Sequence, residues 1–418
     1  MTIDAYITDV GRRAQNAGRV LANQCADVKN AALKLMAELI EADADGLLAA
    51  NAADLAAARD AGMSGALLDR LELDATRIRA MAQGLRDVMR LPDPVGTILS
   101  QRSRPSGIQI TKVRVPLGVV AIVYEARPNV TADAAGLCLK TGNAVILRGG
   151  SEAYQSNRAI VAVLQRALLQ QKLPIDAVQL IETTDRAAVD ALLRAEQFVD
   201  VVIPRGGKSL VKKVTELSRI PVLKHYDGIC HTYIAKDADI AKAVAICHNA
   251  KVQRPCTCNA METLLIDERI AAAVIPPLFK KLREAGVALR GCERTCTLDG
   301  TVTPATDEDW RAEYLDLILS VKIVKDLEEA IAFINEHGSH HSDAIVTENN
   351  HEGAHFLQCV DSATVYVNTS TRFTDGGEFG MGAEMGISTS KLHARGPVGL
   401  EELTTYKYMI RSNAALRT

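Results

Sequence analysis

The sequence has few aromatic residues, no long apolar run and almost no net charge. Only 4% of its 418 residues are aromatic, with one Trp and six Phe, which argues against a surface that stacks on nucleic-acid bases. A formal net charge of −3 gives no basic surface for a polyanion. No apolar run approaches the roughly 18 residues of a membrane span, and the N-terminal stretch lacks the apolar core of a signal peptide. We therefore expect a cytoplasmic protein with no nucleic-acid or membrane partner.

Two nucleotide-binding fingerprints are also absent. The segment "RGGKS" resembles part of a P-loop, but that motif needs glycine six positions before the lysine, and position 202 is Val. The dinucleotide fingerprint G-x-G-x-x-G does not occur either. Any nucleotide must therefore be held in another way.

The hydrophobic pattern predicts an α/β protein with two doubly wound parallel sheets. Residues 5–90 have the periodicity of helices. From residue 118 short apolar runs such as "GVVAIVYEA" and "NAVILRGG" alternate with helical patterns, and the alternation restarts after residue 258. Apolar strands separated by helices indicate βαβ units with a sheet covered on both faces. A length of 418 residues fits two large domains.

Two strand-to-helix turns are rich in glycine and each contains an arginine. They are "NAVILRGGSEAYQSN" (143–157) and "VDVVIPRGGKSLVKK" (199–213). Backbone N–H groups and the helix dipole favour phosphate at such places, and ligands of open α/β sheets bind at the carboxyl ends of strands. A tight turn without a ligand is the alternative, but two such turns in one series favour a phosphate-containing ligand.

The stretch "KVQRPCTCNAMET" (251–263) holds two of the nine cysteines, Cys256 and Cys258. A zinc site would need a second pair or histidines at ligand spacing. The pair Cys292 and Cys296 lies downstream without a fitting histidine, so we expect no metal. A disulfide across one residue would be strained, and cytoplasmic thiols stay reduced.

A nucleophilic cysteine is the remaining interpretation of this pair. The thiolate is the reactive form, and nearby cations lower the pKa of a thiol. Lys251 and Arg254 are close in the sequence and could act in this way. Spacing does not decide which of the two thiols would react, and a non-catalytic thiol or metal-binding protein stays an alternative.

Two loops further on are polar or rich in glycine. His337, His340 and His341 lie in "NEHGSHHSDAIV", and their spacing fits neither H-E-x-x-H nor a zinc finger. A polar loop that shapes a site or caps a helix is the favoured interpretation. The segment "RFTDGGEFGMGAEMGIST" (372–389) has too many glycines for a helix or central strand, which predicts a loop near a ligand or a domain seam.

Together these parts resemble the aldehyde dehydrogenase superfamily, and within it most closely the γ-glutamyl phosphate reductase branch. The similar stretches include "VYEARPNVTADAAGLCLKTGNAVILRGGSEA", "VQRPCTCNAMETLL", "INEHGSHHSDAIVT" and "FTDGGEFGMGAEMGISTSKLHARGPVGLEELTTYKY". They span nearly the whole chain in the expected order. The resemblance implies that Cys258, directly before Asn-Ala, is the nucleophile and that Cys256 occupies a variable position. It also implies that Asn129 donates to the oxyanion.

The resemblance further implies a nicotinamide cofactor. In the family a cationic side chain contacts the cofactor ribose, and its position matches Arg148. The start of the following helix matches Ser151, and the turn under the pyrophosphate matches Gly206 and Gly207. A glutamate that holds the nicotinamide ribose matches Glu313. Ser151 beside Arg148 leaves room for a 2′-phosphate, so the expected cofactor is NADPH.

The resemblance gives the following domain prediction. Residues 1–255 form the NADP-binding domain with a β-arm segment at about 100–117, and 256–375 form the catalytic domain with the nucleophilic cysteine. Residues 376–418 return to the cofactor domain and end in a C-terminal β-arm. Such arms join subunits in this superfamily, so a homo-oligomer is expected.

One departure from aldehyde-oxidising relatives indicates the reaction. Those relatives carry a Glu-Leu-Gly-Gly stretch whose glutamate activates water, whereas the comparable "KHYDGICHTYIA" has no glutamate. The resemblance then implies NADPH-dependent reduction of L-glutamyl 5-phosphate to L-glutamate 5-semialdehyde and phosphate in proline biosynthesis, with functional coupling to glutamate 5-kinase. Arg254, Lys208 and Arg205 are the cations that could assist departure of phosphate. Another acylating aldehyde dehydrogenase, dependent on CoA or phosphate, is the alternative.

Overall fold

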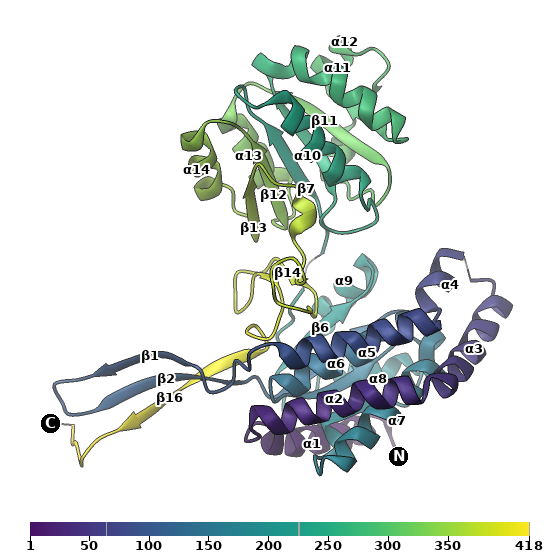
Figure 1. Cartoon of the computed structure of the whole chain (residues 1–418), viewed down its shortest axis with the longest axis vertical. Coiled ribbons are helices and arrows are strands. Elements are labelled where there is room, and N and C mark those ends of the chain that lie inside the picture. Colours follow the sequence, from purple (N-terminus) through teal and green to yellow (C-terminus); the bar gives the residue numbers. More distant parts are fainter. Residues whose placement is uncertain (64, 225, 418) are drawn as a thin grey trace. The chain divides into compact units, whose positions relative to one another are not determined.

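The computed structural model describes residues 1–63, 65–224 and 226–417 and divides the chain into two compact units (Figure 1). Unit 1 contains Met1–Lys224, Gly380–Gly386 and Val398–Thr418, and unit 2 contains His225–Phe379 and Ile387–Pro397. Each unit is built around its own parallel sheet, as the alternating pattern predicted.

Five helices precede the first sheet, as the periodicity of residues 5–90 predicted. On α2 the residues spaced three and four apart, such as Leu33, Met36 and Ile40, are fully buried. Side chains of Thr2 and Asp74 cap α1 and α5 by accepting from backbone N–H groups. None of the helices in the described residues combines the length and apolarity needed to cross a membrane. The helices are α1 Ile3–Leu21, α2 Ala26–Ala42, α3 Ala44–Asp60, α4 Gly65–Leu71 and α5 Ala75–Arg90.

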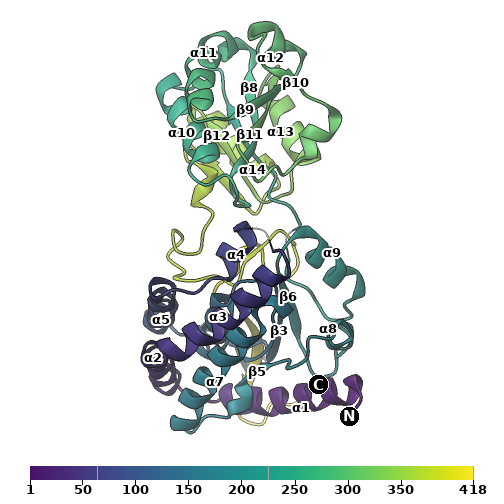
Figure 2. The same ribbon diagram turned by 90° about the vertical axis from the view of Figure 1, so that its right-hand side faces the viewer.

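The main sheet of unit 1 has four parallel strands in the order β5-β4-β3-β6. Helices α2 and α5 pack beside each other and against α6 and α7, while α1 packs against β4 and α8 (Figure 2). The sheet is therefore covered on both faces, which explains why its strands are apolar throughout. Its elements are β3 Val119–Tyr124, α6 Asn129–Lys140, β4 Ala144–Arg148, the 3₁₀ helix η1 Ser151–Ala153, α7 Tyr154–Gln170, the 3₁₀ helix η2 Ile175–Ala177, β5 Val178–Leu180, α8 Arg186–Leu192, β6 Val201–Arg205 and α9 Lys208–Leu217.

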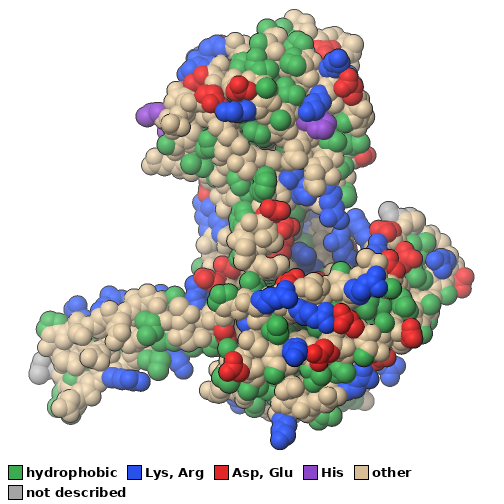
Figure 3. Space-filling model, viewed as in Figure 1, with side chains coloured by type: hydrophobic (Ala, Val, Ile, Leu, Met, Phe, Trp, Pro, Cys, Tyr) green, Lys and Arg blue, Asp and Glu red, His purple; other side chains and the backbone are tan. Residues whose placement is uncertain are grey.

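A three-stranded antiparallel arm belongs to the same unit. It consists of β1 Ile98–Ser103, β2 Gln109–Pro116 and β16 Thr404–Arg411, with β2 in the middle. The arm extends away from the helices of unit 1 (Figure 1), and it contains both the β-arm segment predicted at about 100–117 and the β-arm predicted at the C-terminal end. Its surface includes hydrophobic side chains (Figure 3), among them the exposed residues Ile98, Leu99, Tyr406, Tyr408 and Ile410.

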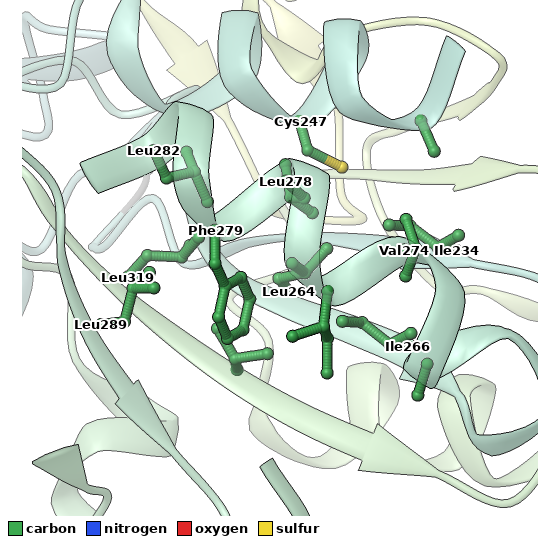
Figure 4. Packing of buried hydrophobic residues seen from close by; sticks show 14 of the residues in the cluster. Ile234, Cys247, Leu264, Ile266, Val274, Leu278, Phe279, Leu282, Leu289 and Leu319 are labelled. Atoms are coloured by element: carbon green, nitrogen blue, oxygen red, sulfur yellow. The ribbon is translucent and has the colours of Figure 1, made fainter. Parts of the chain in front are cut away.

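The sheet of unit 2 has seven parallel strands in the order β10-β9-β11-β8-β7-β12-β13. On one face Leu278 and Phe279 of α11 pack with Leu264 and Ile266 of β8, and the buried Cys247 belongs to the same cluster (Figure 4). The elements are β7 Cys230–Ile234, α10 Ile240–Val252, β8 Met261–Asp267, α11 Glu268–Glu284, β9 Ala288–Gly291, α12 Glu293–Leu298, β10 Thr303–Pro304, η3 Asp307–Arg311, β11 Ile318–Val324, α13 Leu327–His337, β12 Ser342–Val346, α14 Asn350–Cys359, β13 Thr364–Val367, η4 Thr371–Phe373, β14 Ile387–Ser388 and β15 Gly396–Pro397.

The division of the chain differs from the predicted boundary after residue 255. Strand β7 and helix α10 belong to unit 2, because β7 pairs with both β8 and β12 in the interior of its sheet. The return to unit 1 is also interrupted, since 387–397 pack with unit 2. Strand β7 did not stand out in the sequence because it contains His231 and Thr232, both fully buried.

Candidate active site

In unit 1 the residues singled out from the sequence lie where parallel strands end. Asn129 follows β3, Arg148 ends β4 and is followed by Ser151, and Gly206 follows β6. The chain passes from β3 to β4 and β5 and then crosses to β6 on the other side of β3. Ligands of open α/β sheets bind at the carboxyl ends of strands beside such a reversal.

Asn129 is the first residue of α6, and its side chain is held by the next turn of the helix. Its Nδ2 donates to Oδ2 of Asp133 at 3.0 Å. Burial raises the pKa of Asp133 to about 6, while Asn129 and Arg205 act in the opposite direction. The amide group has a second N–H, which stays available for a ligand. Asp133 was not singled out from the sequence, although its spacing of four residues from Asn129 places both on one helix face.

Arg148 is a buried cation whose hydrogen bonds leave one nitrogen over. Its guanidinium donates to the carbonyl oxygens of Gly149 and, at 3.2 Å, of Thr184, and Nε has no partner among the described residues. Burial lowers the pKa of Arg148, and the charge of Glu152 partly restores it. A buried N–H without a partner costs free energy, so this group suits an anionic ligand such as a phosphate.

The neighbouring turn contains a carboxylate as well as the exposed Ser151. A Cβ atom on Gly150 would lie 2.1 Å from Oε1 of Glu152, so this carboxylate is folded against the turn. Glu152 therefore lies beside Ser151 in a position from which it would repel a 2′-phosphate and could accept from a ribose hydroxyl.

The helix after this turn does not offer its N-terminus to phosphate, contrary to expectation. The buried carboxylate of Asp54 accepts from the backbone N–H of Gln155 at 3.1 Å and of Ser156 at 2.8 Å. It also accepts from the Ser156 hydroxyl. A side chain from α3 therefore already supplies the negative charge that the start of α7 favours.

The second glycine turn does bind an anion, and the anion is another carboxylate. The N–H of Gly207 donates to Oε2 of Glu125 at 2.9 Å, and Gly207 is the N-cap residue of α9, so the residue at this position has no side chain that could cap the helix. A Cβ atom on Gly206 would lie 2.5 Å from Cδ of Glu125, so only glycine permits this approach. Glu125 is exposed and stands in for an anionic group at this helix start. The turn thus offers backbone N–H groups to an anionic group.

In unit 2 Cys258 lies in the loop between α10 and β8. Cys258 is half-buried and Cys256 is exposed. The backbone of Gly228 packs against Cys258, since a Cβ atom on Gly228 would lie 1.9 Å from the carbonyl oxygen of Cys258. The thiol of Cys230 donates to the same carbonyl at 3.3 Å. The main chain at Cys258 is thus fixed from β7, while Cys256 has no such contacts among the hydrogen bonds of the described residues.

Gly228 also holds Glu313 close to the main chain of Cys258. Oε1 of Glu313 accepts from the N–H of Gly228 at 2.8 Å, so one glycine separates the Glu313 carboxylate from the main chain of Cys258. The segment that carries Glu313 is held in turn by Glu262 of β8, whose Oε1 accepts from the N–H of Leu315 at 3.2 Å. Leu315 has φ of +53°, a left-handed conformation that needs such support.

The position of Lys251 in the sequence suggested a cation that lowers the pKa of a nearby thiol, but in the structure Lys251 is paired with a buried carboxylate. Its Nζ lies 2.6 Å from Oε2 of Glu262, and both side chains are fully buried. Burial raises the pKa of Glu262 and lowers that of Lys251, because each charge loses its water, and their mutual attraction opposes both changes. The pair stabilises the loop of Glu313, a function that no motif in the sequence indicated.

The glycine-rich segment after β13 contacts the cysteine loop. Nδ2 of Asn259, next to Cys258, donates to the carbonyl oxygens of Arg372 at 3.3 Å and Thr374 at 2.8 Å. The hydroxyl of Thr371 donates to the carbonyl oxygen of Asn259 at 2.7 Å. These contacts place Arg372 beside Cys258, and sequence reasoning did not single out this arginine.

The three histidines of the predicted loop have separate surroundings. His340 Nδ1 lies 2.6 Å from the carbonyl oxygen of Asp361, and His341 Nδ1 lies 2.8 Å from Oγ of Ser342. The ring of His337 lies 4.2 Å from that of Phe333. They do not converge on one ligand, which fits the interpretation of a shaping loop.

A further segment, "HEGAH" (351–355), has the H-E-x-x-H spacing and escaped notice in the sequence. On α14 Glu352 pairs with Lys236, and His355 Nε2 lies 2.8 Å from Oε1 of Glu328. These side chains are therefore engaged with one another. In the part of the chain that the structure describes, no three His, Cys, Asp or Glu side chains are arranged to hold a metal.

Comparison with known proteins identifies the family. The model of the aldehyde dehydrogenase family matches residues 4–290. The chain belongs to the aldehyde dehydrogenase family. Its relatives include a γ-glutamyl phosphate reductase of Moorella thermoacetica, 54% identical over 417 residues that cover 100% of both chains.

Solved structures of aldehyde dehydrogenase relatives agree with this assignment. The γ-glutamyl phosphate reductase of Thermotoga maritima superposes with a TM-score of 0.97 at 44% identity, covering 99% of this chain and 100% of that one. The γ-glutamyl phosphate reductase of Saccharomyces cerevisiae is 33% identical, with a TM-score of 0.55 and coverage of 99% and 98%. The predicted family and fold class are thus confirmed, and family membership implies a nicotinamide cofactor.

Proposed function

We propose that the chain reduces L-glutamyl 5-phosphate to L-glutamate 5-semialdehyde and inorganic phosphate in proline biosynthesis. The observation that carries the proposal is similarity over the full length to enzymes named γ-glutamyl phosphate reductase. The half-buried Cys258 in a main chain fixed by Gly228 and Cys230 supports it, because a nucleophile must be both accessible and held in place.

Cys258 acts as the nucleophile in this mechanism. Its thiolate forms a bond to the γ-acyl carbon, the bond from that carbon to the phosphate oxygen breaks with its electron pair, and phosphate leaves. The resulting thioester is reduced to a thiohemiacetal, which collapses to the aldehyde and releases the thiolate. The absence of a water-activating glutamate in the comparable segment protects the thioester from hydrolysis.

Asn129 is assigned the stabilisation of the oxyanion. Its Nδ2 keeps one N–H on Asp133, which fixes the rotamer and leaves the second N–H for the substrate oxygen. The backbone N–H of Cys258 is the second donor. One donor of this kind contributes about 3 kcal/mol to the stability of a transition state.

We assign cofactor binding to Arg148, Ser151, Gly206, Gly207 and Glu313. NADPH, when bound, supplies the hydride. Arg148 offers a buried N–H that has no partner in the part of the chain that the structure describes, and the start of α9 already accommodates a carboxylate, which supports binding of anionic groups at both positions. Glu125 has to leave Gly207 when the pyrophosphate binds. Glu313, held by Gly228, is assigned to the nicotinamide ribose.

The preference for NADPH is tested at Glu152, which lies beside Ser151. Replacing Glu152 by Gln removes a negative charge near the proposed 2′-phosphate and should lower KM for NADP+ while KM for NAD+ changes little. A wild-type enzyme that uses NAD+ as efficiently as NADP+ would contradict the proposed cofactor without contradicting the reaction.

The reaction is tested in the oxidative direction. Purified protein, L-glutamate 5-semialdehyde and NADP+ should produce NADPH only when inorganic phosphate is present. Coenzyme A in place of phosphate should give no activity, because the acyl acceptor proposed here is phosphate. Dependence on coenzyme A instead would support the alternative acylating aldehyde dehydrogenase.

The arm of β1, β2 and β16 is proposed to join subunits into a homo-oligomer. Its exposed apolar side chains, such as Ile98, Tyr408 and Ile410, support this proposal, because an exposed apolar sheet surface favours association. Light scattering coupled to gel filtration should give a mass above the 45.0 kDa of one chain, and Ile410→Glu should reduce it.

A further inference from the structure

We propose that Arg254 and Arg372 together form the binding site for the phosphoryl group next to Cys258. The inference rests on the proposed function and specifies which cations receive the departing phosphate. Arg205 and Lys208, the other candidates from the sequence, belong to the glycine turn of unit 1 that is assigned to the cofactor.

The first observation is where the chain places Arg372. Its backbone is tied to the residue after the nucleophile, because Asn259 donates to the carbonyl oxygen of Arg372 and accepts from the Thr371 hydroxyl. Its side chain then turns toward the other end of the cysteine loop, where Nε donates to Oε1 of Gln253 at 2.9 Å. Gln253 directly precedes Arg254, so the two arginines flank the loop that carries Cys258.

The second observation is the charge around these guanidinium groups. Neither forms an ion pair with a carboxylate in the described part of the chain, whereas many other arginines of this unit do, such as Arg269 and Arg290. The carboxylate that acts on Arg372 is that of Asp375, whose Oδ1 is already bonded to the N–H of Gly377. Burial lowers the pKa of Arg372, the charge of Arg254 lowers it further, and the Cys258 thiolate raises it.

Arg372 is partly desolvated and the exposed Arg254 acts on it with a like charge, so a dianion that binds between them relieves that repulsion. Arginine suits a phosphoryl group because its planar fork donates two parallel hydrogen bonds to two oxygens. In the first step the electron pair of the breaking carbon–oxygen bond passes to the phosphate, and adjacent cations stabilise the charge that develops there. In the oxidative direction the same pair holds inorganic phosphate for attack on the thioester.

The test measures the dependence of NADP+ reduction on inorganic phosphate in wild type, Arg254→Gln, Arg372→Gln and Arg372→Lys. We expect KM for phosphate to rise at least tenfold in both Gln variants, with KM for the aldehyde and for NADP+ within twofold of wild type. For Arg372→Lys, KM for phosphate should lie between the values for wild type and Arg372→Gln, because lysine keeps the charge but loses the planar fork of the guanidinium group. Arg294→Gln, an exposed arginine of α12 paired with Glu268, is the matched control and should not change KM for phosphate.

Three results would overturn the inference. An unchanged KM for phosphate with a raised KM for the aldehyde would assign the arginines to the substrate carboxylate. Unchanged KM values with a raised pKa for alkylation of Cys258 by iodoacetamide would limit them to stabilising the thiolate. Normal kinetics of Arg254→Gln would overturn the inference even if Arg372→Gln failed to fold. Arg254 is exposed, so its replacement should leave the fold intact. By contrast, a wild-type rate independent of phosphate would refute the proposed function itself.

Discussion

The two sheets place their candidate residues at opposite edges. In unit 1 Asn129, Arg148 and Gly206 stand at or after the ends of β3, β4 and β6. In unit 2 Cys258 and Glu313 come before β8 and β11, at the amino edge. The rule that ligands collect at the carboxyl ends of parallel strands therefore finds Asn129, Arg148 and Gly206 but neither Cys258 nor Glu313. A search that relied on this rule alone would find the glycine turns after β4 and β6 and overlook the cysteine loop.

The electrostatics of the two edges differ in the same way. At the carboxyl edge of unit 1 helix starts provide N–H groups, and carboxylates such as Asp54 and Glu125 occupy them. At the amino edge of unit 2 side chains rather than helix dipoles supply the charge, as with Arg372 and the buried pair Lys251–Glu262. Helix starts follow strands at the carboxyl edge in βαβ units, so the α-helices of such units direct their C-termini toward the amino edge.

The sharpest test of the amino edge compares its two neighbouring cysteines. Cys258→Ala should lower kcat on the order of 10⁴-fold, because the covalent route is lost. Cys256→Ala should stay within about threefold of wild type, since Cys256 is exposed and the contacts from Gly228 and Cys230 are made with Cys258. Steady-state rates of the phosphate-dependent reaction measure both. An inactive Cys256→Ala with an active Cys258→Ala would reverse the assignment.

The buried pair behind the cysteine loop should matter next most, through stability. Lys251→Met leaves Glu262 unpaired in the core and should cost about 3–5 kcal/mol. The double variant Lys251→Met with Glu262→Gln should recover much of this loss, because no buried charge is left alone. Urea unfolding of the three proteins gives the free energies of unfolding. A double variant as unstable as Lys251→Met would contradict a role for the ion pair.

Asn129 tests the carboxyl edge of unit 1. Asn129→Ala should lower kcat about 10²-fold, equivalent to about 3 kcal/mol of lost oxyanion stabilisation. KM for NADP+ should not change, because the cofactor is assigned to Arg148 and the glycine turns. Asn23→Ala, an exposed residue after α1, serves as the control. A rise in KM for NADP+ with kcat unchanged would move Asn129 to the cofactor.

The smallest expected effect concerns the carboxylate that holds Asn129. Burial raises the pKa of Asp133 from 3.8 to about 6, so the native state binds this proton more tightly than the unfolded state. Relative to Asp133→Asn, the free energy of unfolding of wild type should fall as pH rises from about 4 to about 6 and stay level above that. Urea unfolding across this range measures the difference. A difference that grows with pH would contradict a raised pKa.

Much of the fold follows from patterns that the sequence displays directly. Fully buried strands such as β3 and β4 need apolar residues at every position, so their runs are visible without any tertiary information. Strand β7 was not predicted because it contains the polar residue His231, which is buried inside the sheet and donates to Asp343 of β12. A buried polar residue looks like a surface residue until its partner, distant in the sequence, is known.

For the candidate site, the sequence by itself determined the residue types that chemistry needs: a cysteine beside Asn-Ala, glycines after strands, and Asn129 at a helix start. Only the tertiary structure decided which groups surround them. It placed Asp54 at the start of α7, buried Lys251 against Glu262, and brought Arg372 to the loop of Cys258. These partners come from distant parts of the chain, and the electrostatics of each group depends on distance and burial, which spacing along the chain does not express.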